Sequence, residues 1–95
     1  MSAYIVPIAI LRIGRIVATP NALNSITQDD ILLGIQRHQA GDWGNVTEDN
    51  RTANDRALVK GTRILSAYVA ANGTKFWLIT EADRSVTTIL LPEDY

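Results

Sequence analysis

The last third of the chain changes from helical to strand-like patterning, and this change constrains the fold more than any other feature. Three runs rich in β-branched and aromatic residues cover 63–69, 75–80 and 85–91. Asn72-Gly73 separates the first two runs, and this dipeptide is a strong local signal of a β-hairpin. Residues 81–84 supply the next turn. The pattern therefore predicts a three-stranded antiparallel meander over residues 63–91.

Helix start signals precede the meander. Thr19-Pro20 predicts a short helical turn through residue 26, because threonine caps a helix and proline suits its first position. Thr27, followed by two aspartates, predicts a second helix that runs to about residue 40, and Thr47 predicts a third that ends at Gly61. The expected buried positions of the last two helices are Ile31, Leu32, Ile35, Ala53, Ala57 and Leu58.

The N-terminal part reads as a strand. Residues 4–18 predict one long strand, or two with a bend at Gly14, and Pro7 places the first part at a sheet edge or outside the sheet. The apolar run 3–11 has no positive residue before it and is too short to span a bilayer. We therefore expect one cytoplasmic α+β domain over residues 1–95, with its main body in 12–95. Its sheet should have about four strands, with helices on one face.

Composition excludes several kinds of chemistry. The chain has no cysteine and one histidine, which argues against disulfides, thiol catalysis and a zinc site. No phosphate-binding loop, dinucleotide motif or metal-ligand spacing is present, so we expect no cofactor and no metal. A net charge of −1 disfavours a strongly basic nucleic-acid-binding surface, although it leaves a local basic groove open.

Turn lengths predict which side chains share a sheet face. A two-residue turn at Asn72-Gly73 would set Tyr68 opposite Trp77, and Ser66 opposite Ile79. A four-residue second turn would set Thr88 opposite Trp77. The resulting polar face, a candidate binding surface, would carry Ser66, Tyr68, Trp77, Arg84 and Thr88. The other face would hold the helices against Leu65, Ala67, Val69, Phe76, Leu78, Ile89 and Leu91.

Three further positions, His38, Arg84 and Trp43, have two interpretations each. His38 is either the acid or base of a phosphodiester-cleaving site or a structural histidine at a helix end. Arg84 either holds a phosphate or pairs with Glu81 or Asp83 in its own turn. Trp43 either seals the edge of the core or stacks on a substrate. Asn54 and Asp55 are interpreted as a solvated helix face.

From residue 13 onward the chain resembles a family of small bacterial proteins carried by plasmids and prophages. Members are labelled plasmid-related proteins or subunits of type I restriction enzymes, and this chain is too short to be such a subunit. The resemblance is carried by Ile16-Val17-Ala18-Thr19-Pro20, Arg37-His38, Gly41-Asp42-Trp43-Gly44, Asn54-Asp55-Arg56-Ala57-Leu58, the run 80–88 and Leu91-Pro92-Glu93-Asp94-Tyr95.

A second resemblance concerns architecture alone. Helices that carry a histidine, followed by a meander with Arg and Ser/Thr, are similar to ribonucleases of the barnase, EndoU and mRNA-interferase type. That resemblance implies metal-independent cleavage with His38 as acid or base, Arg84 as phosphate clamp, and Ser66, Tyr68 and Thr88 as lining. The chain departs from it in having one histidine and no glutamate evident on the polar face.

These observations favour a mobile-element accessory protein that binds a host protein or a nucleic-acid complex, for instance as an inhibitor of a defence system. The alternative is a ribonuclease or toxin that acts on RNA through His38 and Arg84. A third hypothesis is a homo-oligomer formed through the sheet. Whether the chain is an enzyme stays open on the sequence alone, and no membrane partner is expected.

Overall fold

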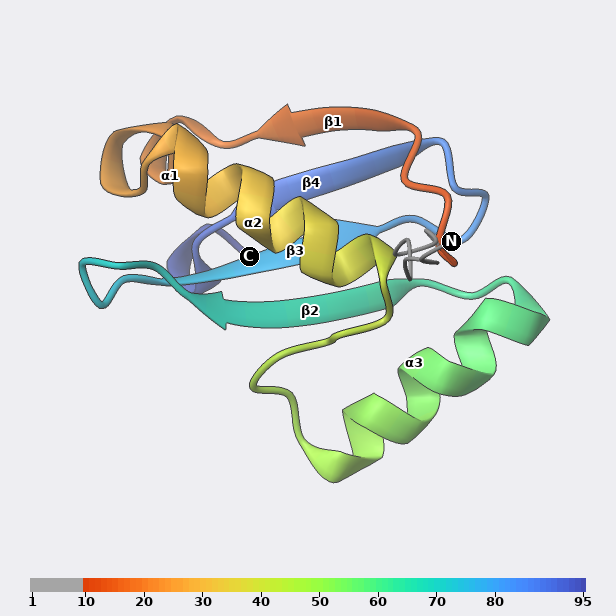
Figure 1. Ribbon diagram of the computed structural model, residues 1–95. Coiled ribbons are helices and arrows are strands. Elements are labelled where there is room, and N and C mark those ends of the chain that lie inside the picture. Colours follow the sequence, from red (N-terminus) through yellow and green to blue (C-terminus); the bar gives the residue numbers. More distant parts are fainter. Residues whose placement is uncertain (1–9) are drawn as a thin grey trace, which may run out of the picture.

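The computed structural model describes residues 10–95, which form a four-stranded sheet with helices packed against it (Figure 1). This confirms the predicted α+β class with a single sheet. The elements, in chain order, are β1 (Arg15–Ala18), α1 (Pro20–Ser25), α2 (Gln28–Gln39), α3 (Glu48–Lys60), β2 (Ile64–Val69), β3 (Lys75–Thr80), β4 (Val86–Leu90) and the 3-10 turn η1 (Pro92–Asp94).

The strand order in the sheet is β1-β4-β3-β2. Strands β2, β3 and β4 form the predicted antiparallel meander. Strand β1 lies beside β4 and runs parallel to it, which requires a long crossover, supplied by the helices and the first two meander strands. Strands β1 and β2 are therefore the two edges of the sheet.

The N-terminal strand is shorter than the sequence predicted. Within the described residues it occupies only Arg15–Ala18, because residues 10–14 are not part of the sheet. Tyr4 and Pro7 lie outside the described residues. Gly14 turns the backbone with a φ of 60° and lies against the Ser85 carbonyl, where there is no room for a Cβ atom. The bend at this glycine begins the strand.

Each helix begins at the threonine that the sequence indicated. The side-chain hydroxyls of Thr19, Thr27 and Thr47 each accept a hydrogen bond from the backbone N–H of the residue three positions later, at 3.1 Å in all three helices. Helix α3 ends at Gly61 with a φ of 72°, the left-handed conformation that glycine adopts without strain. The helix boundaries were therefore predicted correctly.

The buried faces of the helices differ from the prediction. Leu32 is 50% exposed and Ala53 is also exposed, whereas Gly34, His38 and Asn54 are buried. Gly34 allows α2 to approach the sheet, since a Cβ there would lie 3.0 Å from the Phe76 ring. The other expected positions, Ile31, Ile35, Ala57 and Leu58, do pack in the core. The apolar pattern missed only those contacts that small and polar residues make, because such residues carry no hydrophobic signal.

The hairpin between β2 and β3 has a three-residue loop instead of the predicted two-residue turn. The Ala70 amide donates to the Thr74 carbonyl at 2.8 Å, which closes the loop around residues 71–73. Gly73 has a φ of 86°, as the last residue of a three-residue hairpin loop often requires. This extra residue shifts the register, so that Tyr68 pairs with Phe76 and Ser66 with Leu78.

A shift of one residue exchanges the two faces of a strand. The predicted polar face is therefore wrong. Ser66 and Tyr68 face the helices, Trp77 and Thr88 face the other way, and Arg84 lies in the β3–β4 turn. Thr88 pairs with Ile79 and not with Trp77, because the four-residue loop of the second hairpin spans residues 82–85, one position later than expected.

The two faces of the sheet carry different side chains. The helix face, on which α1 and α2 lie (Figure 1), carries Ile64, Ser66, Tyr68, Phe76, Leu78, Thr80, Thr87 and Ile89. The Trp77 face carries Val17, Leu65, Ala67, Val69, Lys75, Trp77, Ile79, Thr88 and Leu90. The larger core cluster joins Phe76, Leu78 and Ile89 of the helix face to Ala22 and Ile26.

Candidate functional site

His38, the only histidine, lies on the inner side of α2 and is fully buried. Its Nδ1 atom is 2.5 Å from the Ser66 hydroxyl, and its Nε2 atom is 2.8 Å from the Thr80 hydroxyl. The edge of its ring packs against Trp43, with the ring centroids 5.8 Å apart. Both ring nitrogens therefore have partners on the helix face.

The hydroxyl groups beside His38 continue as a chain of hydrogen bonds. Thr87 donates to the Ile13 carbonyl at 2.8 Å, and the Thr80 and Thr87 hydroxyls are 2.7 Å apart. A hydroxyl has one proton to donate, so Thr80 donates to Thr87 and accepts from His38 Nε2. The network thus places a proton on Nε2, and in the neutral imidazole Ser66 donates to Nδ1.

The electrostatic environment favours the same neutral form. Burial lowers the pKa of His38 to about 4, and the positive charge of Arg84 contributes in the same direction. A general base at neutral pH needs a pKa nearer 7 and access to its substrate. His38 has neither, so this arrangement serves to link α2 to β2, β3 and β4.

Arg84 is also engaged in structure. Its backbone has a φ of 62°, an uncommon conformation for a residue with a side chain. Its guanidinium donates to the carbonyls of Thr62 at 2.7 Å, Ala57 at 2.9 Å and Glu81 at 3.2 Å. Two of these carbonyls lie at or just beyond the end of α3, where a cation is favoured. Arg84 thus fastens the β3–β4 turn to that helix.

The Gly41-Asp42-Trp43-Gly44 stretch is structural. Trp43 is 1% exposed and donates from its indole nitrogen to Asp55 at 3.0 Å, so it seals the core as one interpretation held. Arg37 binds Asp42 at 2.7 Å and lies over the Tyr68 ring. The Tyr68 hydroxyl donates to the Asp42 carbonyl at 2.6 Å, and burial raises the pKa of Tyr68 to about 12.

Asn54 was missed by the sequence interpretation, which placed it on a solvated helix face. It is buried, and its amide nitrogen donates to the Leu65 carbonyl at 2.7 Å. Its amide oxygen accepts from the Leu65 N–H at 3.3 Å. Farther along the same edge, Ala67 exchanges backbone hydrogen bonds with Trp43 and Asn45. These contacts cover the outer edge of β2. No local signal distinguishes such an asparagine from a solvated one.

The Trp77 face carries the remaining candidates. Trp77 is partly exposed and packs edge-on against Tyr95, with the ring centroids 5.6 Å apart. The guanidinium of Arg63 lies over the Tyr95 ring, 5.3 Å from its centroid, and Tyr95 is 68% exposed. Beside them is a hollow of about 410 Å³ whose lining includes Asn45, Ala67, Val69, Lys75, Trp77 and Pro92. Aromatic and cationic side chains thus gather at the surface here.

Comparisons with known proteins give no relative. No family model, no curated protein and no solved structure matches the chain. Among residues 10–95 no three His, Cys, Asp or Glu side chains come together in a way that could hold a metal ion. In the same part of the chain no helix has the length and apolar character needed to cross a membrane.

Proposed function

We propose that this chain is a non-catalytic binding protein that uses the Trp77 face to bind a host protein. The observation that carries the proposal is the exposed group formed by Trp77, Tyr95 and Arg63. Tryptophan, tyrosine and arginine are the residue types most enriched among the energetic centres of protein interfaces. Each of the three already contacts another, so little side-chain entropy remains to be lost on binding.

The surroundings of this group favour a protein over a nucleic acid. Val69 is 50% exposed, and Ala67 and Pro92 line the adjacent hollow. Among residues 10–95, Lys75 is the one cation that lines the hollow, and the chain has a net charge of −1. Nucleic-acid binding draws much of its affinity from several phosphate–cation contacts. A largely apolar surface with a cationic margin suits a protein that offers apolar side chains and a nearby carboxylate.

The ribonuclease alternative requires His38 to reach a phosphate held by Arg84. His38 is buried with both ring nitrogens bonded, and Arg84 donates to three backbone carbonyls. Cleavage would need both groups to leave these partners together. The geometry therefore supports binding better than catalysis.

The identity of the host partner rests on the sequence resemblance. Because the sequence resembles proteins carried by plasmids and prophages, we propose a cytoplasmic component of the bacterial host as the partner. We propose, more specifically, that this partner is a component of a defence system and that the chain inhibits it.

Photo-crosslinking in a bacterial host tests the proposed surface. A photoreactive amino acid would replace Val69 on the Trp77 face or, as a control, Val59 on α3, which is 91% exposed. We expect a discrete adduct with a host protein from position 69 and none from position 59. Trp77→Ala should remove that adduct. Equal adducts from both positions, or none from position 69, would refute the proposed surface.

Incubation with RNA in the presence of a chelator tests the alternative. We expect no cleavage by the wild-type chain. Cleavage that is lost in a folded His38→Gln variant would instead establish the ribonuclease, and would overturn the non-catalytic proposal.

A further inference from the structure

The two edges of the sheet differ in how they are covered. The outer edge of β2 is bonded to Asn54 and to residues 43–45, as described above. Strand β1 is paired with β4 on its inner side, and no residue of 10–95 forms a second ladder with it. An open edge presents backbone donors and acceptors to another strand. The question is which strand fits β1.

The direction of the β1 backbone groups follows from its ladder. The Arg15 and Thr19 amides donate inward, to Ser85 and Ile89 respectively, both at 3.0 Å. Alternate residues of a strand point their backbone groups to opposite sides, so Ile16 and Ala18 direct theirs outward. Pro20 is the next residue in this outward series and has no N–H. The open edge therefore presents the N–H and C=O groups of two residues, Ile16 and Ala18, and Pro20 prevents the ladder from extending further.

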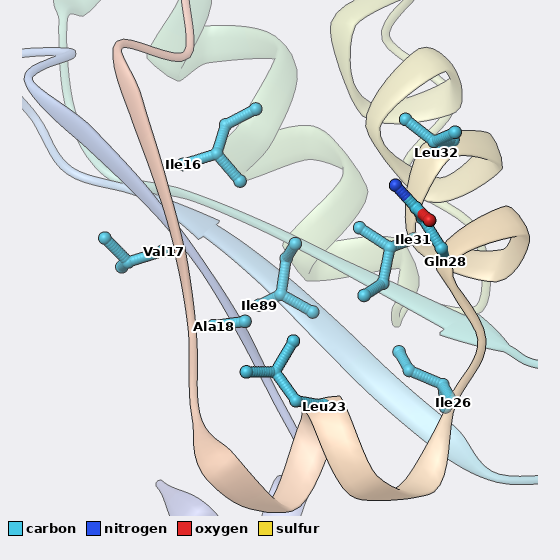
Figure 2. A pocket seen from close by; sticks show the side chains of 9 residues that line it. All are labelled: Ile16, Val17, Ala18, Leu23, Ile26, Gln28, Ile31, Leu32 and Ile89. Atoms are coloured by element: carbon cyan, nitrogen blue, oxygen red, sulfur yellow. The ribbon is translucent and has the colours of Figure 1, made fainter.

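Apolar side chains surround this edge. Ile16 is 42% exposed, Val17 39% and Leu23 61%, although all three are aliphatic. Between β1 and α2 lies a groove of about 540 Å³ that also includes Ile31 and Leu32. Figure 2 shows Ile16 and Ala18 on the groove side of β1 and Val17 pointing away from it. A covering strand would thus bury apolar surface on both sides of the sheet.

We propose that a second copy of this chain covers the edge, with two β1 strands paired antiparallel about a two-fold axis at Val17. In this register Ile16 of each copy lies opposite Ala18 of the other. Both residues point their backbone groups outward, so the two pairs form four hydrogen bonds. This inference concerns the β1 edge, which β4 separates from the strand that carries Trp77, and it does not depend on the function proposed for the group of Trp77, Tyr95 and Arg63.

Charge and backbone geometry favour this register over its neighbour. With the axis at Val17, Arg15 lies opposite Thr19 of the other copy, so no two arginines are opposed. With the axis at Ile16, the flanking partner of Ala18 would be Gly14, whose φ of 60° is not that of a strand. That register would keep only the central pair of hydrogen bonds.

The same symmetry brings the apolar groups together. The α1 end of β1 in one copy lies beside the Ile16 end in the other, so Leu23 of each copy comes near Ile16 of its partner. The two Trp77 faces then lie on the same side of a continuous eight-stranded sheet. Because β1 has four residues, the interface is small and we expect a dissociation constant in the micromolar range.

Sedimentation of the full chain over about 10 μM to about 1 mM tests the dimer. We expect concentration-dependent dimers that Val17→Lys abolishes, because it opposes two positive charges at the axis. Val59→Lys adds the same charge on α3 and should leave association unchanged, with circular dichroism showing that both variants fold. A chain that is monomeric throughout this range, or equal behaviour of the two variants, would overturn the proposal.

Single cysteines test the register, since the chain has none of its own. At Val17 the two Cα atoms would lie about 4.5 Å apart across a non-hydrogen-bonded pair, within the range for a disulfide. We expect Val17→Cys to oxidise to a covalent dimer and Ile16→Cys to remain largely reduced. Preferential oxidation of Ile16→Cys would contradict the Val17 axis. If a chain that lacks residues 1–9 forms dimers and the full chain does not, residues 1–9 cover the β1 edge, and the proposal is overturned.

Discussion

The two faces of the sheet show opposite relations between residue type and exposure. On the helix face Ser66, Thr80 and Thr87 are fully buried around His38. On the Trp77 face Val69 is 50% exposed, and Trp77 and Tyr95 lie at the surface. Three hydroxyl groups are thus buried within an otherwise apolar core, whereas aromatic and aliphatic side chains lie at the surface of the Trp77 face.

The buried polar groups are tolerated because they bond to one another. Within residues 10–95 no buried side-chain nitrogen or oxygen lacks a partner. A buried polar group without a hydrogen-bond partner destabilises the folded state. Removing any one member of this hydrogen-bonded series therefore leaves its neighbours unpaired and lowers the free energy of unfolding. The Trp77 face has no such interdependence. Substitutions of the buried hydroxyl groups should therefore act on stability, and substitutions of the exposed side chains of the Trp77 face on binding.

His38→Ala should give the largest loss of stability. It removes a buried ring and leaves the Ser66 and Thr80 hydroxyls without their partner. We expect the free energy of unfolding in urea to fall by about 4 kcal/mol, as for other large buried side chains. Val69→Ala on the Trp77 face should lower it by less than about 1 kcal/mol. A loss below about 1 kcal/mol for His38→Ala would refute the structural role of the histidine.

Acid should destabilise the chain through the same residue. The pKa of His38 is about 4 in the folded chain and near the ordinary 6.5 when unfolded. Between these values the unfolded chain binds a proton that the folded chain does not. The free energy of unfolding should therefore be greatest above pH 6.5 and decrease by about 3 kcal/mol as the pH falls to 4.

Urea unfolding as a function of pH, compared between wild type and His38→Gln, measures this effect. The variant should lose the slope between pH 6.5 and 5, a range above the titration of the aspartates whose pKa is lowered by hydrogen bonds, such as Asp30 and Asp94. A wild-type chain whose stability is constant over that range would show that His38 is not buried as a neutral group.

Thr87→Val should have a smaller effect. The substitution keeps the shape of the side chain and deletes the hydroxyl that donates to Ile13 and accepts from Thr80. The buried Thr80 hydroxyl and the partly buried Ile13 carbonyl each lose a partner, so we expect the free energy of unfolding to fall by about 2 kcal/mol. Equal stability of the variant and wild type in urea would mean that the hydrogen-bonded chain can close without Thr87.

The contrast between the faces also explains what the sequence could predict. Helix starts at Thr19, Thr27 and Thr47 and the three meander strands are local features, and they were located within one or two residues. The assignment of side chains to the two faces of the sheet depended on the length of the loop between β2 and β3. Asn72-Gly73 is compatible with two- and three-residue hairpin loops, and the choice between them moves Ser66 and Tyr68 to the other side of the sheet.

Non-local contacts were beyond the reach of pattern analysis. The parallel pairing of β1 with β4 and the attachment of Asn54 to Leu65 join residues distant in the chain. The partners of His38 come from β2 and β3, 28 and 42 residues away. A single histidine with unknown neighbours therefore left the catalytic and structural interpretations open. The candidate residues Trp77 and Thr88 kept their surface position because their strands shifted by an even number relative to each other.

Thr88→Val should have the smallest effect on stability and is the matched partner of Thr87→Val. The two threonines are adjacent on β4 and point to opposite faces, so the same chemical change probes each face separately. Thr88 is partly exposed, and valine suits a strand at least as well as threonine. We expect the free energy of unfolding to change by no more than about 0.5 kcal/mol. If Thr88→Val instead destabilised the chain as much as Thr87→Val, the Trp77 face would hold polar contacts of structural weight, and its interpretation as a binding surface would weaken. A stable Thr88→Val chain with reduced crosslinking from position 69 would tie this face to the partner and separate the roles of the two faces.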